Sequence, residues 1–147
     1  MSLNAPIIQG IYTALASAVR VASQIITRDG LMVPASNNTL VPGPSGVPEA
    51  SGLVAYLNVT AAPGVETLQL VLEEQDPVSL TWSQVCATTA TTATGMVKLK
   101  IKPSVTAVAA SITGVVVQDV LPAIWRLRVI HSAASNWTYS LGAVVYG

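Results

Sequence analysis

Residues 53–60 read LVAYLNVT, and this stretch decides the fold. Leucine, alanine, leucine and valine occupy its odd positions, while tyrosine, asparagine and threonine stand among the even ones. Successive side chains of a β-strand point to opposite faces, so this alternation predicts a half-buried strand. Residues 67–74, TLQLVLEE, alternate in the same way after the turn residues at 62–64. Two alternating runs about a short turn predict a β-hairpin.

The same pattern continues toward the end of the chain. Turn residues separate the later runs, as at 76–79, where Asp-Pro-Val-Ser fits a type I turn with a local aspartate cap. Short strands divided by turns are typical of all-β sandwiches and barrels. We therefore expect an all-β fold, specifically an antiparallel β-sandwich that is jelly-roll-like. The further predicted strands are 81–88, 96–102, 125–129 and 137–145.

Residues 1–50 differ from the rest. Proline has no amide hydrogen to give a sheet, and prolines and glycines recur through 33–50, so this segment predicts a long surface loop or an extended arm. Before it, residues 18–27 fit a strand that pairs with the sheet, and residues 7–18 fit a short helix or a strand. We expect one domain overall: an N-terminal arm or strand with a Pro/Gly-rich loop at 1–50, and the sandwich core at 51–147.

Charge is scarce in this chain. Of 147 residues, 51% are hydrophobic and 10% are charged, and seven basic residues balance seven acidic ones. No basic field is available to neutralise phosphates, which argues against nucleic acid as a partner. The most apolar stretch, 105–117, is interrupted by Ser111, Thr113 and Gly114 and is shorter than the roughly 18–20 residues of a spanning helix, which argues against a membrane partner.

The apolar surplus points to association with other proteins. The mean hydropathy of +0.57 is high for a monomer, and large exposed apolar patches mark interaction sites. We expect a protein partner or self-association as a homo-oligomer, with a trimer preferred over a dimer. The first six residues lack the basic start and apolar run of a secretory signal, so we expect synthesis in the cytoplasm without export.

No residue pattern indicates catalysis, a cofactor or a metal. The single histidine, His131, has no second histidine beside which to hold zinc, and is expected to be a turn residue with a local hydrogen bond. Cys86 is expected to pack in the core. Glu73 and Glu74 are adjacent in a predicted strand and so point to opposite faces, which suits edge solubility better than an acid/base pair. We expect a protein that is not an enzyme.

The three tryptophans admit two interpretations. Exposed indoles would stack on sugar rings, as in a carbohydrate-binding module. Trp125 and Trp137, however, each lead an alternating apolar run, and buried aromatic side chains contribute strongly to a core. We favour core packing for these two and for Trp82.

Five of the seven cations stand in two rows. Lys98, Lys100 and Lys102 share one face of a predicted strand, and Arg126 and Arg128 share a face of another. One interpretation is a solvated sheet face whose charges discourage edge-to-edge pairing. The other is a partner-binding surface for an acidic protein, to which these five residues are the candidate contacts.

Several segments resemble one family of viral structural proteins. The most specific are the D-P-x-S turn at 76–79 and the L-P-x-x-W-R-x-R-V run at 121–129. Together with residues 52–61, the Pro63-Gly64 turn, residues 66–68 and residues 134–143, they resemble the capsid decoration (head cement) proteins of tailed bacteriophages. The resemblance covers about residues 15–147. The sequence departs from it at Leu80, where the family favours glycine, and in the longer proline-rich segment at 33–50.

The resemblance implies a β-sandwich without enzymatic activity that sits on the assembled capsid. The expected function is therefore that of a virion structural protein, on the capsid surface, which stabilises the head by binding the major capsid protein. Two alternatives remain open. One is a structural subunit of the tail or baseplate, and the other is a carbohydrate-binding β-sandwich module.

Overall fold

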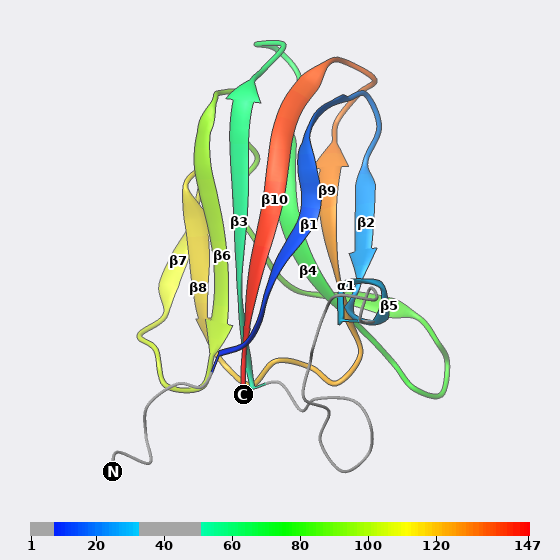
Figure 1. Ribbon diagram of the computed structural model, residues 1–147, viewed down its shortest axis with the longest axis vertical. Coiled ribbons are helices and arrows are strands. Elements are labelled where there is room, and N and C mark those ends of the chain that lie inside the picture. The colour runs from blue at the N-terminus through cyan, green and yellow to red at the C-terminus, as the bar shows by residue number, and fades with distance from the viewer. Residues whose placement is uncertain (1–7, 33–50) are drawn as a thin grey trace.

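The computed structural model describes residues 8–32 and 51–147, and the prediction of a loop or arm at 33–50 lies outside these residues, as do residues 1–7. The described chain is almost entirely β-structure (Figure 1). Its elements are β1 (Ile8–Arg20), β2 (Gln24–Thr27), α1 (Arg28–Met32), β3 (Gly52–Ala61), β4 (Leu68–Gln75), β5 (Trp82–Ala87), β6 (Gly95–Lys102), β7 (Val108–Ser111), β8 (Gly114–Gln118), β9 (Trp125–His131) and β10 (Trp137–Tyr146).

The strands form two sheets. Sheet A has the order β1-β10-β3-β6-β8-β7, and sheet B has the order β2-β9-β4-β5. All neighbours are antiparallel except β6 and β8, which run parallel. The six strands predicted from residue 53 onward are confirmed as β3, β4, β5, β6, β9 and β10, with small differences at their ends.

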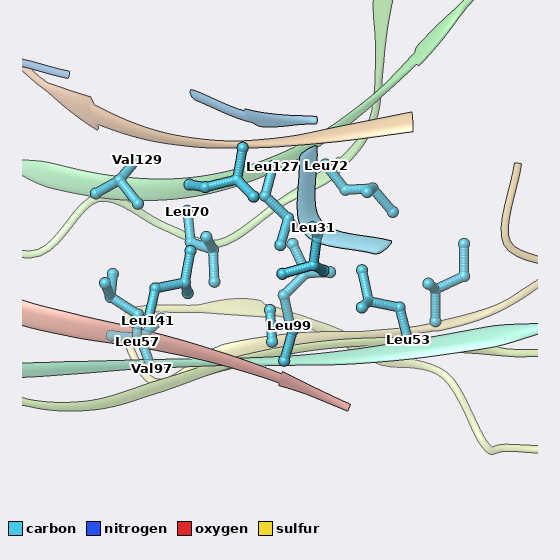
Figure 2. Packing of buried hydrophobic residues seen from close by; sticks show 14 of the residues in the cluster. Leu31, Leu53, Leu57, Leu70, Leu72, Val97, Leu99, Leu127, Val129 and Leu141 are labelled. Carbon is cyan, nitrogen blue, oxygen red and sulfur yellow. The ribbon is translucent and has the colours of Figure 1, made fainter. Parts of the chain in front are cut away.

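The core lies between the sheets, as in a β-sandwich. Leucines from β3, β6 and β10 of sheet A face leucines from β4 and β9 of sheet B (Figure 2). In β10 buried and half-buried residues alternate along the whole strand, which is the pattern of a strand with one face on a core. The alternation in the sequence therefore identifies the core face correctly.

The predicted hairpin of residues 53–74 is wrong. β3 pairs with β10 and β6 in sheet A, whereas β4 pairs with β5 and β9 in sheet B. The two strands do not lie side by side. Instead, their leucines face each other across the core, as Leu57 and Leu70 do in Figure 2. The connection through residues 62–67 thus crosses from one sheet to the other.

The N-terminal segment contributes a strand to each sheet. β1 pairs along β10 at one edge of sheet A, and β2 pairs with β9 at one edge of sheet B. The pairing expected within residues 18–27 is confirmed for 18–20, which pair with β10, and for 24–27, which pair with β9. The choice between helix and strand for 7–18 is decided as strand from Ile8 onward. Residues 8–27 therefore belong to the same folded body as the strands after residue 51.

Helical structure is minor in the described residues. α1 spans five residues, and no helix in ranges 8–32 and 51–147 is long and apolar enough to cross a membrane.

The loop between β4 and β5 forms around Asp76, as predicted. Its carboxylate accepts hydrogen bonds from the amides of Val78 (2.8 Å) and Ser79 (3.3 Å), and these two bonds lower the pKa of Asp76. The next residue, Leu80, has a φ of 60° and is 62% exposed. A leucine in this left-handed region is strained, and here little packing compensates for the strain.

We expect Leu80→Gly to stabilise the protein. The left-handed conformation costs a non-glycine residue about 1–2 kcal/mol, whereas glycine loses about 0.5–1 kcal/mol more in backbone entropy on folding. The net expectation is a rise in the free energy of unfolding of about 0.5–1 kcal/mol, measured by urea denaturation. Leu80→Ala is the control, because alanine is strained in the same conformation and should not raise the free energy of unfolding. A glycine variant less stable than the parent would contradict the left-handed turn.

Candidate partner-binding surfaces

The lysine row lies on the outer face of sheet A. In β6 the side chains of Val97, Leu99 and Ile101 are buried in the core, so the lysines between and after them point away from it. Lys98 is exposed, and Lys100 and Lys102 are half-buried. We call this row of three residues (Lys98, Lys100 and Lys102) the lysine face.

Two tyrosines, one on β3 and one on β10, lie against the lysines at the two ends of this row. Lys98 Nζ lies 5.7 Å from the ring centre of Tyr56, its partner in the β3–β6 register. Lys102 Nζ lies 4.1 Å from the ring centre of Tyr146 on β10, beyond the intervening strand β3. Lys102 crosses β3 at Gly52, where a Cβ would collide with the lysine side chain. Both distances suit cation–π attraction, which orders the ammonium groups on the face.

The lysine face has no acidic counterpart within the described residues. No carboxylate of residues 8–32 and 51–147 lies within ion-pair distance of the three lysines. The six strands of sheet A contain no aspartate or glutamate at all. Val54, directly opposite Lys100, is 5% exposed although it points outward, so part of the apolar surface of this face is covered.

The arginine row lies on the outer face of sheet B and is paired. Arg126 Nε donates to Glu73 Oε1 at 2.8 Å, and Arg128 Nη1 donates to Glu73 Oε2 at 3.4 Å. Glu73 is 8% exposed, and the Arg126 guanidinium lies 4.2 Å from the ring centre of Trp82 on β5. The Glu73 carboxylate therefore neutralises part of the positive charge through which Arg126 and Arg128 were expected to bind an acidic partner.

The structure thus separates the five candidate residues into two groups. The lysines point outward from sheet A and the arginines point outward from sheet B, with the core between them. A partner that binds one face of the sandwich can therefore contact the lysine row or the arginine row, but not both. Whether either row binds a partner stays a prediction.

Two sequence predictions on sheet B are wrong. Glu73 does not serve edge solubility, because it lies on the central strand β4 opposite Arg126 and is buried in ion pairs. Trp82 is not in the core: it is half-buried on the outer face. A bulge between β4 and β5 leaves Val85 unpaired, which shifts the alternation, so that Trp82 faces outward while Cys86 faces inward.

The other tryptophans and the cysteine lie where predicted. Trp125 is 1% exposed and Trp137 is 0% exposed, so neither offers an indole face to a sugar. One face of Trp82 is occupied by Arg126. Burial raises the pKa of Cys86 to about 12, which keeps this thiol protonated and unreactive near neutral pH.

His131 ends strand β9 and does not lie in a turn. Its Nε2 is 2.9 Å from the hydroxyl of Tyr139, which lies on β10, so the predicted local hydrogen bond instead connects the two sheets. The Arg20 guanidinium lies 4.9 Å from the ring centre of Tyr139 and donates to its carbonyl oxygen at 2.6 Å. Sequence reasoning missed Arg20 because its contact with Tyr139 joins residues 119 positions apart, and it missed Tyr139 because the hydrogen bond between His131 and Tyr139 connects two different sheets.

We expect this cluster to make stability depend on pH. Burial first, and then the charge of Arg20, lower the pKa of His131 from its ordinary value of 6.5. The unfolded chain therefore binds the proton more readily, so stability is complete above pH 6.5 and declines as pH falls below it. Thermal unfolding midpoints measured across this range test the expectation. His131→Gln, which cannot titrate, should show a flatter profile, and an equally steep one would contradict it.

The described residues show neither a cluster of metal ligands nor, in the pocket lined by residues from 91–97 and 112–113, room for a large ligand. No group of three or more His, Cys, Asp or Glu side chains in residues 8–32 and 51–147 is placed to hold a metal ion. A shallow pocket of about 110 Å³ lies between the 91–97 segment and Ile112, which is small beside the roughly 300 Å³ or more of typical ligand sites.

No family model matches this chain, and no curated protein matches it. The chemistry of the two outer faces therefore carries the functional argument.

Proposed function

We propose that this protein is a non-enzymatic structural subunit of a tailed-phage virion. It decorates the capsid surface and stabilises the head by binding the major capsid protein, after synthesis in the host cytoplasm. A jelly-roll-like chain path and an N-terminal arm that reaches a neighbouring subunit belong to the same proposal.

The observation that carries this proposal is the outer face of sheet A. It bears three lysines without a carboxylate partner among the described residues, in strands that lack acidic side chains. On β1 of the same sheet, Ile11 is 73% exposed and Val19 is 62% exposed. A face that is apolar and carries charge of one sign suits the binding of a protein surface of the opposite charge.

The stabilising effect follows from mass action. A protein that binds only the mature capsid lattice lowers the free energy of that state and of no other. The two-sheet body, with its core between the sheets, suits a clamp between neighbouring capsomers. No bond is made or broken in this role, which agrees with an inert Cys86 and with a Glu73 already engaged by arginines.

Purified virions test the proposal. Mass spectrometry and electron cryomicroscopy should find this chain coating the heads. Heads without it would overturn the proposal, and density confined to tail rings or tubes would favour the tail or baseplate alternative. Fluorescence of Trp82 titrated with a glycan panel should show no quenching, and saturable quenching would favour the carbohydrate-binding alternative.

The N-terminal arm is tested on the same particles. Deletion of residues 1–7 removes no residue of β1 and shortens the proposed arm. Capsid occupancy should fall relative to the full chain. Occupancy equal to that of the full chain would count against the arm.

A further inference from the structure

Two separate surfaces of the described residues each carry an excess of one sign of charge. The lysine face carries positive charge on sheet A. One end of sheet B carries three exposed acidic residues, which we call the acidic end. These residues are Asp29, Glu74 and Asp76.

The fold brings the acidic end together from distant parts of the sequence. Asp29 lies in α1, directly after the β2 residue Thr27 that pairs with Arg126. Glu74 pairs with Trp125 at the start of β9, and Asp76 follows in the β4–β5 loop. The Arg28 side chain of α1 donates to the carbonyl oxygen of Ala123, and the amide of Gln75 at the end of β4 donates to the carbonyl oxygen of the next residue, Ile124, so α1 and the end of β4 meet at the same loop before β9.

Most of this negative charge is free of cations in the described chain. The Asp29 side chain is 79% exposed and pairs with Arg28 at 3.1 Å, while Glu74 and Asp76 are exposed and have no ion pair within residues 8–32 and 51–147. The acidic end keeps a net negative charge after Arg28 is counted. The lysine face is positive and the acidic end is negative, so the two surfaces are electrostatically complementary.

We propose that the lysine face of one copy binds the acidic end of a second copy. The two surfaces differ and do not overlap, so the contact can form twice in a twofold dimer or repeat from copy to copy in a closed ring such as a trimer. In such an assembly the lysine face is covered by the next copy, and the exposed apolar residues Ile11 and Val19 on β1 are left to contact the capsid. This inference rests on the proposed structural role, because it assigns the surfaces through which the subunits meet each other.

Analytical ultracentrifugation of the full chain tests the proposal. Self-association should be evident at about 50 mM salt and should weaken strongly at about 500 mM, because salt screens charges at a partly exposed interface. Lys98→Glu with Lys100→Glu should weaken the association by about tenfold or more, and so should Asp29→Lys with Glu74→Lys. Asp76 is left unchanged because its carboxylate caps the β4–β5 loop.

A fourfold variant separates complementarity from simple loss of charge. When all four substitutions are combined, both surfaces are reversed and the net charge returns to that of the parent, so association should recover. Val65→Glu with Thr92→Glu adds negative charge at exposed positions outside both surfaces and should leave association unchanged. Circular dichroism confirms that each variant is folded.

Three outcomes would overturn the inference. The first is a parent chain that is monomeric at low salt. The second is a lysine variant that associates as strongly as the parent. The third is an acidic-end variant that associates as strongly as the parent although the lysine variant associates weakly. In the last case the lysine face binds another partner. Capsid occupancy of the parent is measured independently, so the proposed function survives or fails on its own result.

Discussion

Trp137→Ala should lower the free energy of unfolding by about 3–5 kcal/mol, a loss typical of large aromatic side chains in cores. Trp137 begins β10 and is 0% exposed, and the ring of His131 meets it edge-on with ring centres 6.4 Å apart. Alanine would leave a cavity beneath both sheets that the surrounding strands close only partly. Urea denaturation followed by circular dichroism measures the change.

Trp137→Phe is the matched control for this cavity. Phenylalanine retains most of the apolar volume and removes the indole Nε1, which is buried and has no hydrogen-bond partner among the described residues. Because the phenylalanine variant no longer buries an unpaired N–H group, it regains part of the stability that the smaller ring costs. It should therefore lose less than half as much stability as the alanine variant. An alanine variant within about 1 kcal/mol of the parent would show that this tryptophan does not support the core.

Glu73→Gln should lower the free energy of unfolding by about 2 kcal/mol. The substitution keeps the shape of the side chain but leaves Arg126 and Arg128 without their shared carboxylate. Removing one partner of a fully buried pair costs about 3–5 kcal/mol, and the smaller figure allows for the 19% and 30% exposure of the two arginine side chains. Urea denaturation at neutral pH gives the measurement.

The neighbouring carboxylate provides the control. Glu74→Gln removes the same charge from the next residue, which is exposed and forms no ion pair within the described chain, so its effect should stay within about 0.5 kcal/mol. A double-mutant cycle between Glu73→Gln and Arg126→Gln should show a coupling energy of about 1 kcal/mol or more. Equal effects of the two glutamine substitutions would mean that Glu73 is solvated in solution.

The candidate site was predictable in part. The spacing of Lys98, Lys100 and Lys102 between Val97, Leu99 and Ile101 was sufficient to place a basic row on the outside of a sheet. The same reasoning placed Arg126 and Arg128 on an outer face. It missed Glu73 as their partner, because a side chain one strand away in space is fifty-three residues away in sequence.

The sequence by itself determined the positions of β3, β4, β5, β6, β9 and β10 and, except in β5, which face of each is buried. It did not predict β7 or β8. Period-two alternation is a local property of a strand, so the residues of β3 or β10 display it without reference to their neighbours. The Asp76 turn is likewise local, since its hydrogen bonds span two and three residues. Scarce charge in turn favoured association with other proteins.

Only the tertiary structure decided which strands lie side by side. Alternation is the same for a hairpin and for two strands that face each other across a core, so it could not distinguish β3–β4 pairing from their packing in opposite sheets. A single bulge reversed the orientation of Trp82, and the parallel β6–β8 pair depends on Gly114, where a Cβ would collide with the carbonyl oxygen of Lys98. These features arise between residues far apart in sequence, and their energies depend on partners that a local pattern does not specify.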